Sequence, residues 1–336
     1  MPQEQVSSDI QDKFFQIIKN KIPSNISLVN SLAELLNVST DSAYRRIRGQ
    51  KELSFDEIKI LCLNFGISLD ALFFDTPDIV PFHYKPFNKE INSFEQYLES
   101  VAIILESTFQ YTDKKIYFEG KDIPLANLIY SPEIISFRSF FWSKVVYSQP
   151  GFEHKTFDIS EVDSRLVNLG NRILNLLQVI PTIEVWNEDT INSTIRQIEF
   201  SQEAGYFRNN NVPQTLLEKL SDWLVHFQMQ ATVGKRFKPD QQVSGIDDNF
   251  QLFYTETLIP NNNILIKKDD ALSVYLSQND LTILVTRHPE FCKDQKEWLE
   301  NLIRKSTAIT ISSEKERNKF FLKLHSKIDQ MKNKLP

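Results

Sequence analysis

The sequence predicts two domains: an all-α N-terminal domain of five short helices, and a C-terminal α+β domain that is mostly helical with a small antiparallel sheet near its end. The 336 residues exceed the usual size of a single domain, which is about 100–200 residues. Apolar residues recur three and four apart through most of the chain, whereas a β-rich pattern begins at residue 249. Three prolines within ten residues disfavour helix, so we expect domains at 1–75 and 92–336 joined by a proline-rich linker at 76–91.

Composition favours a globular protein of a reducing compartment. Apolar residues make up 41% and charged residues 24%, as in ordinary folded domains. The two cysteines, Cys62 and Cys292, lie in different predicted domains, so a disulfide framework is not expected. The polar N-terminus lacks the apolar core of a signal peptide, and no apolar run is long enough to span a bilayer. We therefore expect a cytoplasmic protein with no membrane partner.

Helix-capping residues divide the first domain into short helices. Amphipathic spacing predicts the first helix near 8–22, and Ser27 can cap the second. Asn37 can end the second helix because Asn tolerates the left-handed conformation. Ser39 or Thr40 then caps a third helix.

Two further helices complete this domain. Ser54 and Glu57 form a capping box that opens a fourth helix, which Gly66 ends. Ser68 caps a short fifth helix with the sequence LDALFF. Because a three-residue turn separates the second and third helices, the five-helix domain has a helix-turn-helix arrangement.

Residues 28–73 resemble the phage-repressor-like helix-turn-helix family, of the Cro and lambda repressor type. The matching features are Leu32-Ala33-Glu34, Val38-Ser39 at the start of the third helix, Arg48-Gly49-Gln50-Lys51, and the apolar pattern from Phe55 to Leu72. Three positions depart from the family pattern. Asn37 replaces the usual turn glycine, the inward apolar residue falls at Ile47 rather than at Arg46, and Val29 stands where a polar phosphate contact is common. The shifted apolar position implies a slightly rotated third helix.

The resemblance implies a sequence-specific DNA-binding transcriptional regulator. We do not expect an enzyme, because the second domain shows no convergent set of polar residues. The third helix would enter the major groove. Contacts to base edges are expected from Ser39, Thr40, Asp41, Ser42, Tyr44 and Arg45, and contacts to phosphates from Arg46, Arg48 and Lys51. The chain has a net charge of -6, but residues 44–51 contain four cations and no acid, and local charge is what phosphates meet.

A homodimer is expected because one short helix covers few base pairs. Each specific pair contributes only about 1–3 kcal/mol of discrimination, and two-fold symmetry doubles the contacts. Two alternatives stay open. The arginines can form a merely solvated face or pair with Asp41 and Glu52, or the helix-turn-helix can serve a protein-interaction adaptor that no longer touches DNA.

Four long helices are expected in the C-terminal domain before residue 249. They lie near 92–110, from Pro132 onward, at 159–180 and at 213–231. The helix at 159–180 carries three heptads of apolar positions, which suit either a coiled-coil dimer or an intramolecular bundle. We favour the bundle, because extra apolar residues widen the stripe beyond a two-stranded seam.

The predicted sheet lies near the end of the chain. FQLFYTETLI, the turn PNNN and ILIKK predict a hairpin from residue 250, and strands are expected at 281–286 and 307–311. IYFEG at 116–120 is a further candidate strand. A second capping box at Ser313 opens a final helix.

No catalytic motif is present in the sequence, and we expect neither a metal nor a cofactor. His288 and Cys292 lie four apart, but Pro289 disrupts a shared helical face. Arg138, within SFRSFFW, is the candidate for an anionic ligand or, alternatively, for stacking on an aromatic ring. Glu184, Glu188 and Asp189 are interpreted as a solvated helix start. We interpret residues 92–336 as the dimerisation domain and as the candidate for sensing a small-molecule or peptide effector.

Overall fold

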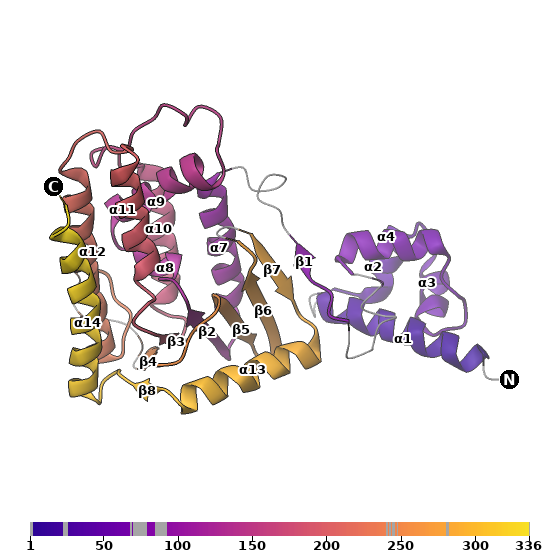
Figure 1. Ribbon diagram of the computed structural model, residues 1–336. Helices are drawn as coiled ribbons and strands as arrows, with labels where there is room; N and C mark the ends of the chain where they lie inside the picture. The colour runs from indigo at the N-terminus through magenta and orange to yellow at the C-terminus, as the bar shows by residue number, and fades with distance from the viewer. Residues whose placement is uncertain are drawn as a thin grey trace. The chain divides into compact units, whose positions relative to one another are not determined.

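The chain divides into two compact units, Met1–Pro81 (unit 1) and Phe82–Pro336 (unit 2). The computed structural model describes residues 3–22, 26–67, 69, 79–84, 93–239, 241, 243, 246, 248–279 and 282–335, except for the side chains of 3–9 and 20. Each unit has its own buried hydrophobic core. Figure 1 labels the helices and strands of both units.

Unit 1 is helical over its described residues. Its helices there are α1 (Gln3–Lys21), α2 (Leu28–Leu35), α3 (Thr40–Ile47) and α4 (Phe55–Phe65). Their buried apolar residues form one cluster, which comprises Phe14, Phe15, Ile18, Leu32, Ala43 and Leu61. The predicted fifth helix lies outside the described residues, apart from Leu69.

Local capping chemistry sets the helix ends in unit 1. The Ser39 hydroxyl accepts a hydrogen bond from the Ser42 amide at 3.2 Å. Asn37 has a φ of 51° and so adopts the left-handed conformation at the turn between α2 and α3. Ser54 and Glu57 form the predicted capping box at the start of α4.

Unit 2 is built on one eight-stranded mixed sheet covered by helices. Its helices are α7 (Phe94–Phe109), α8 (Leu125–Leu128), α9 (Pro132–Phe141) with a π-helical turn η1 (Trp142–Val146), α10 (Ser164–Leu177), α11 (Asn192–Glu203), α12 (Val212–Val233), α13 (Pro289–Arg304) and α14 (Glu314–Lys332). Its strands are β1 (His83–Tyr84), β2 (Lys114–Gly120), β3 (Thr182–Trp186), β4 (Phe250–Tyr254), β5 (Asn263–Lys268), β6 (Ala271–Ser277), β7 (Ile283–Thr286) and β8 (Thr307–Ala308).

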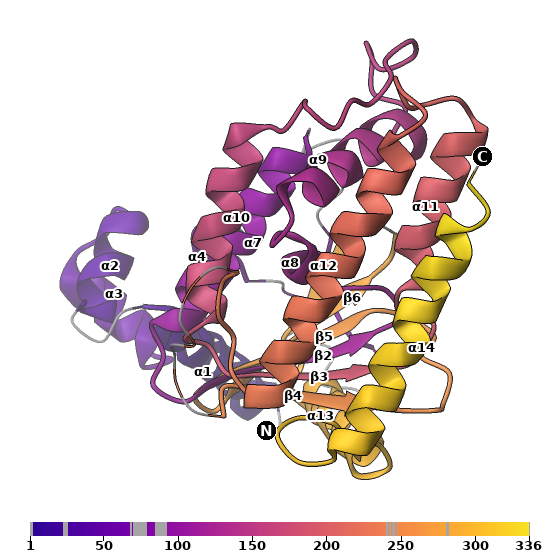
Figure 2. The ribbon, with the colours of Figure 1, turned by 90° about the vertical axis from the view of Figure 1, so that its left-hand side faces the viewer.

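The order of the strands is β1-β7-β6-β5-β2-β3-β4-β8. The central strands β2, β3 and β4 are parallel, and the other neighbouring pairs are antiparallel. Helices α7 to α12 and α14 cover one face, whereas α13 packs on the other face beside β5 and β6 (Figures 1 and 2). The carboxyl ends of the three parallel strands therefore open at one edge of the sheet.

The fold class predicted from the sequence is wrong for this unit. The sheet is neither small nor antiparallel nor confined to the end of the chain, because β2 and β3 form its centre. β3 escaped prediction because it is short and largely buried, and such strands lack the alternation of polar and apolar residues. The observed architecture is a large mixed sheet with helices on both faces.

The predicted hairpin between β4 and β5 is also wrong. β2 and β3 lie between these two strands in the sheet. The hairpin that does form joins β5 to β6, with Asp269 at a φ of 51° in its turn. The sequence interpretation missed β6 altogether.

The helix with the heptad pattern packs within unit 2. α10 lies against α7, and Arg172 of α10 bridges Glu99 at 2.6 Å and Glu106 at 2.5 Å. Its heptad residues Leu166 and Ile173 are buried in the core. The intramolecular interpretation is thus the one that the structure supports.

Part of the predicted linker belongs to unit 2. His83 and Tyr84 pair with β7 as an edge strand, and the ring centroid of Phe82 lies 5.6 Å from that of Phe291. The rest of the linker at 76–78 and 85–91 lies outside the described residues. Over the part of the chain that the structure describes, no helix is both long and apolar enough to cross a membrane.

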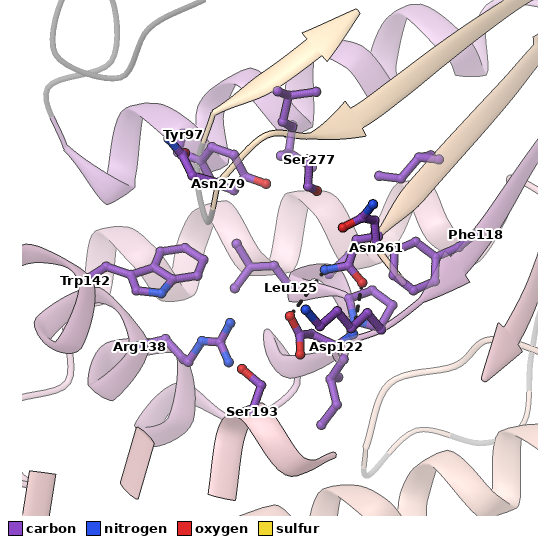
Figure 3. A pocket seen from close by; sticks show the side chains of 18 of the residues that line it. Tyr97, Phe118, Asp122, Leu125, Arg138, Trp142, Ser193, Asn261, Ser277 and Asn279 are labelled. Carbon is purple, nitrogen blue, oxygen red and sulfur yellow. Dashed lines mark hydrogen bonds between the residues drawn. The ribbon is translucent and has the colours of Figure 1, made fainter. Parts of the chain in front are cut away.

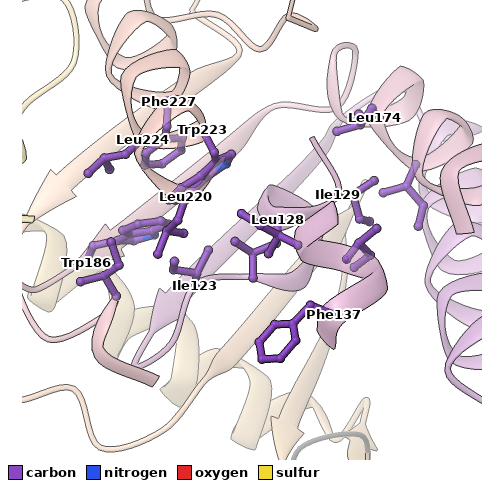
Figure 4. Packing of buried hydrophobic residues seen from close by; sticks show 14 of the residues in the cluster. Ile123, Leu128, Ile129, Phe137, Leu174, Trp186, Leu220, Trp223, Leu224 and Phe227 are labelled. Carbon is purple, nitrogen blue, oxygen red and sulfur yellow. The ribbon is translucent and has the colours of Figure 1, made fainter. Parts of the chain in front are cut away.

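Aromatic packing fills the core between the sheet and α12. Trp186, Trp223 and Phe227 stack in series, with 4.7 Å between the centroids of Trp186 and Phe227 (Figure 4). Gly170 of α10 lies against Ile129, where an added Cβ would stand 2.2 Å from Ile129 Cγ2. The glycine therefore permits a close approach between α10 and the segment after α8.

Candidate functional site

The exposed side of α3 gathers four side chains. Asp41, Tyr44, Arg45 and Arg48 follow the spacing i, i+3, i+4 and i+7 and are all exposed. The opposite side faces the core through Ala43, Arg46 and Ile47. We call Tyr44, Arg45, Arg48 and the following Lys51 the basic face of unit 1.

Arg46 is not part of the basic face, and the expectation that it points outward to a phosphate is wrong. Its side chain is 4% exposed. Arg46 Nη2 lies 2.6 Å from Glu57 Oε1, and Nη1 donates to Ser42 Oγ at 2.6 Å and to Ser42 O at 3.1 Å. The second Glu57 oxygen accepts from the Ser54 amide at 2.9 Å. Arg46 therefore joins α3 to the first turn of α4.

The Arg46 ion pair also holds Glu57 in its charged form. The hydrogen bond from Arg46 lowers the pKa of the Glu57 carboxyl below its ordinary value of 4.5, and the Ser54 amide adds to this effect. Since the guanidinium is almost completely buried, losing either partner would leave an uncompensated charge.

Gln11 of α1 positions the loop after α3. Its side-chain amide donates to the carbonyl oxygens of Arg46 at 2.7 Å and Lys51 at 2.9 Å, while its Oε1 accepts from the Leu53 amide at 3.1 Å. Gly49, at a φ of 69°, lets the chain turn at the helix end. The backbone that bears Lys51 is thus fixed relative to α3.

The cations of the basic face are available to a ligand. Within the described residues, Arg45, Arg48 and Lys51 form no ion pair, and all three are exposed. The guanidinium carbon of Arg48 lies 4.5 Å from the ring centroid of Tyr44, which fixes its direction. The alternative pairing with Asp41 or Glu52 does not occur in this structure.

The remaining predicted contact residues lie at the start of α3. Ser39, Thr40 and Asp41 are exposed, and Asp41 stands in the first turn, where the helix dipole favours an acid. Ser42 is half-buried and its hydroxyl already accepts from Arg46. Sequence reasoning did not assign a role to Gln11 or predict the ion pair of Glu57 with Arg46, because both depend on tertiary contacts.

Arg138 of unit 2 stacks on an aromatic ring, which is one of its two predicted alternatives. It is 5% exposed, and its guanidinium carbon lies 4.9 Å from the ring centroid of Trp142. Nη1 also donates to Thr194 Oγ1 at 3.1 Å. The same side chain lines a cavity at the edge of the sheet.

The other polar candidates of unit 2 have structural partners. A ring nitrogen of His288 accepts from the Phe291 amide at 3.4 Å and caps α13, while Cys292 is buried. Glu184 is not solvated, as had been expected, but is buried in β3 and paired with Arg236. No group of three or more potential metal ligands exists among the described residues.

Comparison with protein-family models, with curated proteins and with solved structures finds no match for this chain.

Proposed function

We propose that unit 1 binds double-stranded DNA with α3 in the major groove, and that the chain regulates transcription from the site it recognises. The basic face is the observation on which this proposal rests. Arg45, Arg48 and Lys51 are exposed on one side of a short helix and its loop, with no competing carboxylate partner among the described residues. Such a surface suits a phosphate-lined groove.

The size of α3 fits this role. A helix with its side chains is about 10–12 Å across, and the major groove is about 12 Å wide. Arg45 lies in the middle of the exposed side and is the candidate for bidentate pairing with a guanine. Arg48 and Lys51, at the helix end and in the loop, are assigned to phosphates.

Arg46 supports the proposal indirectly. By linking α3 to α4 and by packing under the helix, it holds the basic face in one orientation. A rigidly held helix orders fewer groups upon binding, which favours specific recognition. Arg46 itself makes no contact with DNA in this proposal.

Binding as a homodimer forms part of the proposal. α3 contains eight residues and can contact only a few base pairs. Two copies related by a two-fold axis would recognise both halves of a palindromic site. The length of DNA that the protein protects tests this, since a dimer predicts two half-sites about one helical turn apart.

Selection of genomic fragments tests DNA binding directly. The full chain should enrich a defined set of fragments, and footprinting should place them on one sequence. The Arg45→Ala/Arg48→Ala double variant should enrich none of them, whereas Lys293→Ala, which removes an exposed cation of α13, should behave as wild type. Equal enrichment by wild type and the double variant would contradict the proposal.

Protein binding by unit 1 is the second candidate, and one observation favours it. α4 exposes two large apolar side chains, Phe55 at 86% and Leu63 at 75%. Phe55→Ser should abolish a protein contact made through α4 and leave DNA binding through α3 intact. If the Arg45 variants lose DNA binding but keep the protein contact, the DNA-binding role is favoured.

A further inference from the structure

A cavity of about 270 Å³ opens at the carboxyl end of β2 in unit 2. Its walls come from α7, from the segment after β2, from α9 and η1, from the start of α11 and from the ends of β5 and β6 (Figure 3). Ligands of open α/β sheets bind outside the carboxyl ends of the parallel strands. The volume lies close to the lower limit for small-molecule sites, which is about 300 Å³.

One end of this cavity is polar and favours an anion. Figure 3 shows Arg138 and Trp142 beside each other, with the Ser193 hydroxyl close to the guanidinium. Trp142 is 4% exposed, and its Nε1 has no hydrogen-bond partner among the described residues. Because an indole nitrogen only donates, that buried group requires an acceptor.

The charges around the cavity agree with this polarity. Its lining contains the two cations Lys121 and Arg138 and one carboxylate, Asp122. The backbone and carboxylate of Asp122 bond to Asn262, at 2.9 Å and 3.5 Å. Burial raises the pKa of Tyr97, which also lines the cavity, to about 12, so its phenol stays neutral.

The other end of the cavity is apolar. A second space of about 110 Å³ lies between α7 and the sheet, and Tyr97, Val101, Phe118 and Ala126 line both spaces. Its further walls are mainly aliphatic and include Ile104, Leu105, Ile116 and Ile266. Glu184, at its margin, is already paired with Arg236 and adds no free charge.

We propose that this cavity binds a small amphipathic carboxylate, of which a medium-chain fatty acid is the simplest form. The carboxylate accepts hydrogen bonds from Arg138 and from Trp142 Nε1. The aliphatic chain passes Ala126 and enters the space between α7 and the sheet. Inorganic anions would fill only the polar end, and neutral alcohols lack the negative charge that a guanidinium attracts.

Calorimetric titration of the full chain tests the proposal with three probes. Octanoate should bind, whereas acetate, which lacks the chain, and octanol, which lacks the charge, should each bind about tenfold or more weakly. Binding of acetate or octanol as tight as that of octanoate would overturn the assignment, and so would the absence of octanoate binding.

Two variants test the two ends of the site separately. Arg138→Gln should weaken octanoate binding about tenfold or more by removing the cation, and Ala126→Leu should do the same by filling the passage. Arg196→Gln, which removes an exposed charge from α11, should bind octanoate as wild type does. If Arg138→Gln does not fold, Ala126→Leu alone decides the matter, and unchanged octanoate binding in it would overturn the proposal. None of these outcomes depends on DNA binding by unit 1.

Discussion

Arg46 and Glu57 form an ion pair beneath α3, with 2.6 Å between Arg46 Nη2 and Glu57 Oε1. The same carboxylate closes the capping box of α4 through its other oxygen. One acid thus caps a helix and neutralises a cation of the preceding helix. Arg46 thus supports α3 from below, whereas Arg45 and the C-cap residue Arg48 lie on the surface.

Arg46→Ala should therefore destabilise unit 1 without removing any side chain of the basic face. Removing one partner of a buried ion pair costs about 3–5 kcal/mol, and we expect about 2–3 kcal/mol because Glu57 is partly exposed. Hydrogen exchange of the α3 and α4 amides measures this loss. Arg45→Ala is the matched control, and equal protection in the two variants would contradict the buried role of Arg46.

The lowered pKa of Glu57 predicts that acid destabilises unit 1. Because its pKa is lowered in the folded state, the unfolded chain binds more protons below about pH 4.5, the ordinary value. Its stabilising contribution is complete above that value and is lost as the pH falls through the folded pKa. Backbone amide resonances of α3 and α4 report the transition.

Glu57→Gln retains a capping side chain at the third helix position but cannot titrate. Below about pH 4.5, the stability of this variant should fall less steeply with decreasing pH than that of wild type. An identical transition in both proteins would show that the ion pair does not contribute.

Glu119 predicts the opposite pH dependence for unit 2. This β2 residue is fully buried, and burial raises its pKa to about 7, although the Asn263 amide donates to it at 2.7 Å. The folded state therefore binds more protons than the unfolded chain between about pH 4.5 and pH 7, and stability falls as the pH rises through this range. The difference corresponds to about 3 kcal/mol.

Tryptophan fluorescence can follow this effect, because all four tryptophans of the chain belong to unit 2. Glu119→Gln should have a different stability from wild type, but that stability should not fall between pH 5 and pH 8. Glu297→Gln, at an exposed site on α13, should retain it. If the stability of Glu119→Gln depends on pH as steeply as that of wild type, Glu119 is not the group that titrates in this range.

Gly170→Ala should destabilise unit 2 although alanine favours helix. An added Cβ would clash with Ile129 Cγ2, and overpacking of this kind costs about 1–3 kcal/mol. Urea unfolding followed by tryptophan fluorescence measures the change. Asn175→Ala, at an exposed position of the same helix, should be neutral or stabilising. The same result for Gly170→Ala would contradict the close contact between Gly170 and Ile129.

The sequence predicted the turn between α2 and α3 and the helix caps of unit 1 because local chemistry determines them. Asn37 and the pair Ser54 and Glu57 act within a few residues of themselves, so their roles can be inferred from spacing. The buried state of Arg46 could not be inferred in this way, since its partner lies eleven residues further on and on another helix. The shift of the apolar position to Ile47 was the single clue.

Unit 2 was predicted poorly because its central strand pairs are distant in sequence. β2 pairs with β3 across more than sixty residues, and β3 pairs with β4 across a similar distance. Because acidic residues follow Glu184 in the sequence, it was predicted to be solvated. In the structure it is buried, and Arg236, far along the chain, neutralises it. Nothing in local periodicity reports such contacts.

Base recognition by Arg45 can be measured by comparing two DNA sites. Binding of the full chain to its selected DNA site and to a scrambled site should be compared for wild type, Arg45→Ala and Lys51→Ala. We predict that Arg45→Ala loses about 1–3 kcal/mol of discrimination between the two sites, and that Lys51→Ala weakens both equally and reduces the salt dependence. Affinities for both sites that match wild type in both variants would contradict the placement of α3 in the groove.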